Sequence, residues 1–287
     1  MPESDPHRPA PRPERPYRPG GRSDRERRPY PPRGARPPPR ADREDFEQVI
    51  CGLRACEAVF ERRAAAILRV YYRHDRLAQV SPILRWVAER RLPYHELDEE
   101  QLVRLTESTH HEGFAMAVRP LRCVSWQEAA AANPRAWVAL DRVENPHNAG
   151  AIIRTCAFFG VEAALLGGLS PTTRLSTAFL RMAEGGAEWL HIAGCTHVPE
   201  VLLGLRHRGV TAIGFETDGK PFPPDEPLPS PLIFVFGNEQ AGLSPLARRH
   251  CAAVYRIPGR GHVASLNVSV TAGIVLAEWA RRTPAPA

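Results

Sequence analysis

The chain has 287 residues, 43% of them hydrophobic, so it is long enough for two modest domains with buried cores. It lacks the run of roughly 18 apolar residues that a membrane-spanning helix needs, and its first residues lack the apolar stretch of a secretory signal. Its six cysteines include no CxxC pair and no metal-ligand spacing. These features argue against a membrane protein and predict a cytoplasmic chain with reduced thiols.

Residues 1–43 consist almost entirely of proline, arginine, glycine and acidic residues. They hold 12 arginines and 6 acidic residues, which accounts for the net charge of +6 of the whole chain. Such a composition offers too little apolar surface to offset the entropy lost on folding, so we expect a disordered tail. This arm could bind RNA phosphates by releasing counterions or serve only as a solubilising segment, and its composition leaves both open.

Residues 44–120 alternate between helical and strand-like patterns and are predicted to form a small α/β domain. Apolar residues recur with helical spacing over residues 46–63 and 81–91. Runs rich in β-branched, aromatic or other apolar residues predict strands at 66–72, 93–97 and 113–118. Residues 121–134 are expected to link this domain to the next.

Residues 135–287 show a more regular alternation of strands and helices. Strands are expected at 137–143, 161–167, 190–194, 210–216, 231–237 and 253–259, and helices at 148–160, within 173–189, at 198–209 and at 267–282. This alternation predicts a parallel sheet with helices on both faces. Ligands bind beyond the carboxyl ends of such strands, so the loops at 142–150, 237–245 and 258–267 should hold the site.

Those three loops carry distinctive sequences: ENPHNAGAIIRT at 144–155, FGNEQAGLS at 236–244 and IPGRGHVASLNVS at 257–269. In this order and at these strand ends, they resemble the three signature motifs of the SpoU (TrmH-type) RNA 2′-O-ribose methyltransferases. Residues 50–120 resemble the L30e-like substrate-binding domain that often precedes the catalytic domain of that family.

The resemblance implies a fold, a division into domains and a set of partners. The fold is a SPOUT-type parallel sheet with a trefoil knot, and the methyl donor is S-adenosylmethionine. The partners are RNA, either ribosomal or transfer RNA, and a second copy of the chain in a homodimer. The implied division is a tail at 1–43, an RNA substrate-binding domain at 44–120, a linker at 121–134 and the methyltransferase domain at 135–287.

The resemblance also implies roles for residues of all three loops. Positions of the catalytic site are matched by Asn148, Arg154, Glu239, Ser265 and Asn267, and positions that contact the cofactor by Gly237, Ile257 and Leu266. Asn148 could equally be only the N-cap of a helix that begins at Ala149, and Asn267 only the N-cap of the last helix.

Arg154 matches a family arginine that is thought to activate the 2′-hydroxyl. An arginine is a poor base because its pKa lies far above neutrality. We therefore expect Arg154 to hold an RNA phosphate and to stabilise the negative charge that develops on the ribose oxygen. The group that removes the proton stays open.

One segment of the small domain departs from the family pattern. Relatives commonly read His-Gln-Gly where this chain has His111-Glu112-Gly113, so Glu112 places a negative charge near the expected RNA contacts. His110 and His111 are adjacent on a strand-like segment and should point apart, which argues against a metal site.

The sequence therefore predicts an enzyme that methylates RNA ribose from S-adenosylmethionine, with ribosomal RNA favoured over transfer RNA. No phosphate-binding GKS or GKT loop and no dinucleotide fingerprint is present, so ATP and NAD enzymes fit poorly. The alternative is a non-catalytic RNA-binding or ribosome-assembly factor that keeps the fold, suggested by the basic tail and the altered His-Glu-Gly segment. Saturable binding of S-adenosylmethionine distinguishes the two.

Overall fold

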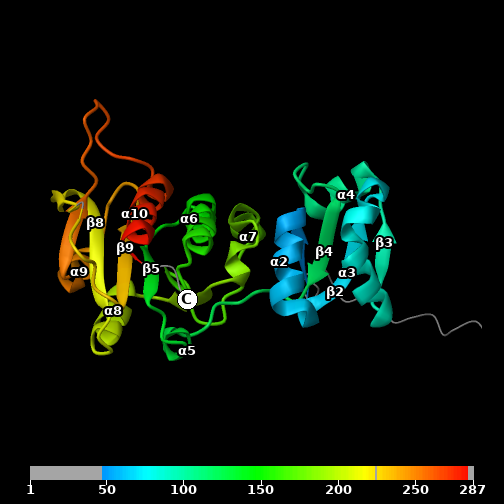
Figure 1. The fold of residues 1–287 in the computed structure, drawn as a ribbon, viewed down its shortest axis with the longest axis horizontal. Helices are drawn as coiled ribbons and strands as arrows, with labels where there is room; N and C mark the ends of the chain where they lie inside the picture. Colours follow the sequence, from blue (N-terminus) through cyan, green and yellow to red (C-terminus); the bar gives the residue numbers. More distant parts are fainter. Residues whose placement is uncertain (1–46, 224, 284–287) are drawn as a thin grey trace, which may run out of the picture. The chain divides into compact units, whose positions relative to one another are not determined.

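The computed structural model describes residues 47–223 and 225–283, which form a four-stranded and a six-stranded sheet (Figure 1). The tail predicted at residues 1–43 lies outside these residues. The four-stranded sheet falls within residues 48–118 and the six-stranded sheet within residues 136–256. The predicted α/β class is confirmed.

The four-stranded sheet has the order β1-β4-β2-β3. Its strands are β1 (Gln48–Cys51), β2 (Ile67–Tyr72), β3 (Tyr94–Glu96) and β4 (Phe114–Val118). β4 runs antiparallel to both β1 and β2, whereas β2 and β3 are parallel. The strands predicted at 66–72, 93–97 and 113–118 are confirmed.

All five residues of the central strand β4 are buried because helices cover both faces of the sheet. Phe114, Met116 and Val118 share a core with α2 (Leu53–Arg63) and α3 (Leu77–Glu89). Ala115 and Ala117 point to the opposite face and pack with α4 (Glu99–Thr106). Because alternate residues of a strand face opposite sides of the sheet, β4 contributes to two separate cores.

One prediction for this region was wrong, and one helix was not predicted. The helix predicted over 46–63 is interrupted, because Gln48–Cys51 pairs with β4 and Gly52, at φ 93°, turns the chain before α2 begins. Helix α4 was missed, although Asp98 and Gln101 form a complete capping box at its start.

The six-stranded sheet is parallel throughout and has the order β10-β8-β9-β5-β6-β7. Its strands are β5 (Ala136–Asp141), β6 (Ala163–Gly167), β7 (His191–Cys195), β8 (Thr211–Pro221), β9 (Leu232–Gly237) and β10 (Ala253–Arg256). Every residue of the two central strands, β5 and β9, is buried. This agrees with the continuous apolar runs of their sequences.

Helices cover both faces of this sheet, as predicted. One face packs against α6 (Pro146–Phe159), α7 (Thr177–Ala183) and α10 (Val268–Arg282). The other packs against α5 (Trp126–Ala131), α8 (Val198–Arg206) and α9 (Pro245–His250). Helix α5 lies within the segment predicted as a linker. Because all six strands are parallel, the loops that follow β5, β9 and β10 leave the same edge of the sheet.

Candidate active site

The loop after β5 leads directly into α6, and its capping differs from the prediction. Asn145 is the N-cap, since its side chain accepts a hydrogen bond from the backbone of His147 at 2.9 Å. Pro146 occupies the first helical position, where a missing N–H costs nothing. The assignment of Asn148 as the N-cap was therefore wrong, and its side chain is free to make tertiary contacts.

Side chains of the three predicted loops meet at this edge of the sheet. The Asn148 amide donates to Glu239 Oε1 at 2.6 Å, and the Asn267 amide donates to Asn148 Oδ1 at 3.1 Å. Asn267 also caps α10, because its Oδ1 accepts from the backbone of Ser269 at 2.8 Å. Asn148, Glu239 and Asn267, hereafter the Asn-Glu-Asn cluster, join segments that are far apart in sequence.

The loop after β9 folds back tightly on itself. Asn238 and Gly242 exchange two backbone hydrogen bonds of 3.0 and 2.9 Å. A Cβ atom on Gly237 would lie 2.2 Å from the carbonyl carbon of Gly242, so no larger residue fits there without moving the loop. Gly237 is thus required by the turn itself, and Glu239 lies within that turn.

Two poorly exposed carboxylates hold the end of this loop. Asp141, the last residue of β5, accepts from the backbone of Ser244 at 2.6 Å, and Glu216 of β8 accepts from the backbone of Leu243 at 2.8 Å. Arg248 of α9 forms an ion pair with the second Glu216 oxygen. Neither acid was predicted from the sequence. For Asp141 the available signal was an acidic residue closing an otherwise apolar strand.

We expect Glu216→Gln to lower the free energy of unfolding by about 1–3 kcal/mol, the cost of disrupting a poorly exposed, charge-assisted contact. The Glu216 side chain is 13% exposed. Asp218 contacts the same arginine at 2.8 Å but is 68% exposed, so Asp218→Asn should cost less than about 0.5 kcal/mol. Urea unfolding followed by tryptophan fluorescence measures both variants. Equal losses would mean that Glu216 does not hold the loop.

The remaining predicted catalytic residues lie outside the Asn-Glu-Asn cluster. Arg154, on α6, pairs with Glu184 Oε1 at 2.7 Å, and its side chain is 55% exposed. Ser265 is exposed and makes no hydrogen bond with the described part of the chain. The structure thus assembles three of the five predicted residues, while Arg154 is available at the surface nearby on the helix that carries Asn148.

The loop between β10 and α10 carries the other predicted cofactor residues. Ile257 packs on the core, whereas Leu266 is 50% exposed. In Figure 1 this orange segment extends beyond the sheet. Within the described chain, the backbone N–H groups of residues 259–266 have no backbone partner. Free backbone donors beside exposed apolar side chains suit the adenosine portion of S-adenosylmethionine, so the residues present fit this cofactor.

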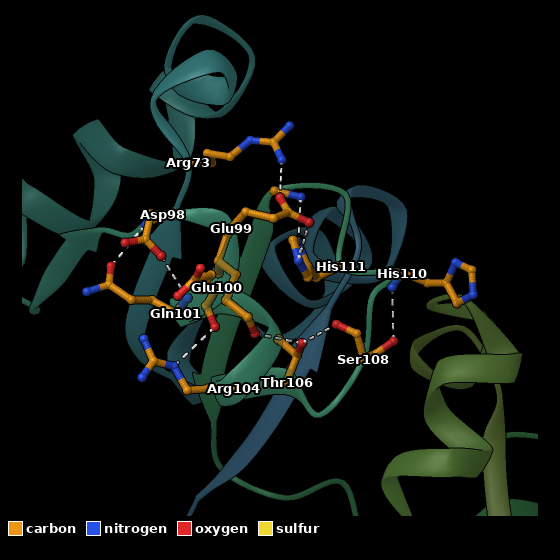
Figure 2. Close-up of polar contacts among 12 residues, drawn as sticks. Arg73, Asp98, Glu99, Glu100, Gln101, Arg104, Thr106, Ser108, His110 and His111 are labelled. Atoms are coloured by element: carbon orange, nitrogen blue, oxygen red, sulfur yellow. Dashed lines mark hydrogen bonds and ion pairs between the residues drawn. The ribbon is translucent and has the colours of Figure 1, made fainter.

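The His-Glu-Gly segment has a structural role in the small sheet's domain. Figure 2 shows the ring of His111 turned towards Glu99 and the ring of His110 turned away from it. His111 Nδ1 accepts from the backbone of Gly113 at 3.0 Å, and its Nε2 lies 3.2 Å from Glu99. Glu112 accepts from the backbone of Leu53 at 2.7 Å, so its charge lies at the positive end of α2.

No metal or disulfide chemistry is evident in the described residues. They contain no group of three or more His, Cys, Asp or Glu side chains placed to hold a metal ion. All six cysteines are free thiols. Burial raises the pKa of Cys123 to about 11 and those of Cys195 and Cys251 to about 12, so these thiols stay protonated near neutrality.

None of the helices in residues 47–223 and 225–283 combines the length and apolarity needed to cross a membrane.

Family models match both halves of the chain. The model described as "SpoU rRNA Methylase family" matches residues 135–277, and that described as "RNA 2′-O ribose methyltransferase substrate binding" matches residues 49–123. A protein of Escherichia coli O157:H7, named as an uncharacterized tRNA/rRNA methyltransferase, YfiF, is 33% identical over 242 residues. That alignment covers 83% of this chain and 69% of the relative. A Haemophilus influenzae protein named as an uncharacterized tRNA/rRNA methyltransferase is 29% identical, with 81% of this chain and 66% of the relative covered.

Solved structures have the same fold. An rRNA methyltransferase from Sinorhizobium meliloti with bound AdoMet is 26% identical at a TM-score of 0.66, and the match covers 84% of this chain and 88% of that one. The SpoU methyltransferase AviRb from Streptomyces viridochromogenes, also with AdoMet, has a TM-score of 0.70 at 20% identity, with 85% and 93% covered, and shows the fold alone. The fold and the three loops define an RNA methyltransferase. The chain belongs to the SpoU rRNA methylase family, as the sequence predicted.

Proposed function

We propose that this protein transfers a methyl group from S-adenosylmethionine to the 2′-hydroxyl of a ribose in RNA, with ribosomal RNA favoured over transfer RNA. The observation that carries the proposal is the Asn-Glu-Asn cluster, in which one polar residue from each motif meets at the carboxyl edge of the sheet. The match of residues 49–123 to a 2′-O-ribose methyltransferase substrate-binding model supports ribose as the acceptor. The rRNA methyltransferase of Sinorhizobium meliloti supports ribosomal RNA.

Different residues of this chain would bind the cofactor, orient the ribose and stabilise the developing charge. Gly237, Ile257 and Leu266 would hold the cofactor, whose sulfonium group supplies an electrophilic methyl. The Asn-Glu-Asn cluster would orient the ribose, since positioning alone can supply roughly 7–11 kcal/mol of such a barrier. Arg154 would give up its ion pair with Glu184 and bind an RNA phosphate instead. It would also stabilise the negative charge that develops on the 2′-oxygen. Ser265 would help to orient the third loop.

We take residues 44–120 as the substrate-binding domain, 121–134 as the connection and 135–287 as the methyltransferase domain, which would contain the trefoil knot. We place the protein in the cytoplasm as a homodimer. Support for the dimer comes from exposed apolar side chains on two adjacent helices, with Phe158 on α6 and Val270 and Ile274 on α10.

The test is tritiated methyl transfer from S-adenosylmethionine to total RNA from a strain that lacks this gene. Label should enter RNA with the wild-type protein and survive alkali in dinucleotides, which locates the methyl on the 2′-oxygen. Asn148→Ala should lower transfer by about 10²-fold if the amide orients the reacting group. His147→Ala, on the same helical turn, should retain activity.

A failure would have a distinct form. If no RNA fraction takes up label and calorimetry detects no S-adenosylmethionine binding, the proposal is wrong. RNA binding without cofactor binding would then identify the non-catalytic RNA-binding factor.

A further inference from the structure

A cavity of about 540 Å³ opens where β5 and β6 end. Its walls are mostly apolar and come from both strands, the loops that follow them and α7. They include Leu140, Val143, Leu166, Leu169, Leu175 and Phe179. The volume falls within the range of about 300–1,000 Å³ that is typical of small-molecule sites.

This cavity is separate from the residues assigned to the cofactor. None of Gly237, Ile257 and Leu266 lines it. The strand order β9-β5-β6 places the Gly237 loop on one side of β5 and the cavity on the other. The molecule therefore offers a concave surface apart from these three residues at the same edge of the sheet.

The cavity adjoins the Asn-Glu-Asn cluster through the first turn of α6. Pro146 and Ala149 line the cavity, and Asn148 lies between them in sequence while its side chain reaches Glu239. One turn of an α-helix rises about 5.4 Å, so a ribose held by Asn148 would carry its attached base within reach of the cavity.

The charges at the cavity lining suit an RNA ligand. Arg142 and Arg174 line the cavity, and Arg142 also donates to the carbonyl oxygen of Gly242 at 3.3 Å. Guanidinium groups bind phosphates and stack on bases. Glu144 has no hydrogen-bond or ion-pair partner in the described part of the chain, and a carboxylate accepts from the amino groups of bases. Apolar walls and a charged lining together match the flat, polar-edged shape of a nucleobase.

We propose that this cavity receives the base of the nucleotide whose ribose is methylated, unstacked from its neighbours in the RNA. This inference rests on the proposed function, and it assigns to the cavity the recognition of the base that is attached to the methylated ribose. Enzymes that act on a nucleotide commonly extrude it from the stack and bind the base in a pocket. Here the base would enter beside β6 while the ribose faces the Asn-Glu-Asn cluster.

The test fills the cavity in the full-length protein. Leu169 is a partly buried wall residue, and Leu169→Trp should occupy the space of the base. We expect kcat/KM for total RNA from the gene-deletion strain to fall about tenfold or more, the equivalent of one lost stacking interaction. The Kd of S-adenosylmethionine, measured by calorimetry, should not change. Leu203→Trp, on the exposed face of α8 and outside the cavity, is the matched control and should change neither value.

Each outcome decides the proposal. Unchanged kcat/KM for RNA in a folded Leu169→Trp protein overturns it, and so does a loss of S-adenosylmethionine binding, which would assign the cavity to the cofactor. If Leu169→Trp lowers the unfolding midpoint, Glu144→Ala at the exposed lining of the cavity decides instead. We expect this variant to lower kcat/KM for RNA several-fold. An unchanged kcat/KM for RNA would overturn the proposal. If the wild-type protein transfers no methyl group, the proposed function fails. Filter binding of the same RNA to Leu169→Trp and to Leu203→Trp then still tests the cavity.

Discussion

Replacing Arg154 by alanine is expected to lower kcat for methyl transfer about 10²–10³-fold, the cost of removing one group that stabilises charge in the transition state. The affinity for S-adenosylmethionine should be little changed, because Arg154 lies on α6 and is bonded to neither the second nor the third loop. Single-turnover transfer of tritiated methyl measures the first quantity and calorimetry the second.

The surroundings of Arg154 make this variant easy to interpret. Its partner Glu184 is 44% exposed, and an exposed pair of this kind contributes only about 0–1 kcal/mol to stability. Arg154→Ala should therefore remain folded, and a loss of activity would reflect chemistry. The same weakness of the pair means that an RNA phosphate can compete with Glu184 for the guanidinium.

Two further variants separate charge from geometry at this position. Glu184→Gln removes the competing carboxylate and should preserve activity or tighten RNA binding. Arg154→Lys keeps the charge but loses the planar fork that binds phosphate through two parallel bonds, so it should remain strongly impaired. Full activity of Arg154→Ala would remove Arg154 from the mechanism and leave the Asn-Glu-Asn cluster and Ser265 as its proposed polar contributors.

The fold was predictable where local pattern and burial agree. The central strands β5 and β9 lie in continuous apolar runs, and every residue of both is buried. β1 was not predictable in this way, since Gln48–Cys51 is short and becomes a strand only through pairing with β4, more than sixty residues away. Helix α4 could have been predicted, because the capping box of Asp98 and Gln101 is a local sequence signal.

The candidate site was predictable in its location and only partly in its contacts. Motifs at the ends of β5, β9 and β10 had to meet, because parallel strands end at one edge of the sheet. The bond from Asn148 to Glu239 depends on where α6 begins. Its N-cap is Asn145, three residues before Asn148, the cap that the sequence suggested. Glu216 reaches Leu243 only through the tertiary fold, which one sequence without its structure does not reveal.

In the Asn-Glu-Asn cluster, a structural role and the proposed catalytic role can belong to the same residue. Asn267 is the N-cap of α10 and at the same time donates to Asn148. The two interpretations that the sequence left open for this residue are therefore compatible. A cap fixes the orientation of the side chain, and a fixed side chain positions a substrate better than a mobile one.

Gly237→Ala is expected to abolish measurable S-adenosylmethionine binding and to destabilise the fold by about 1–3 kcal/mol, the usual cost of overpacking. The added Cβ would lie 2.2 Å from the Gly242 carbonyl carbon and 2.4 Å from the Leu243 nitrogen. Both are backbone atoms, so relief requires moving the loop that carries Glu239. Calorimetry of cofactor binding and urea unfolding measure the two effects.

Gly259→Ala is the matched control for this prediction. Gly259 lies in the third loop, and a Cβ atom there would have no neighbour within 4 Å. Both glycines gain one methyl group in a loop assigned to the cofactor, but only Gly237 faces the returning backbone. Gly259→Ala should therefore leave stability and cofactor affinity nearly unchanged. If both variants bind S-adenosylmethionine as tightly as the wild type, the turn after β9 does not form the cofactor site. If both lose binding equally, the close contact with Gly242 is not the cause.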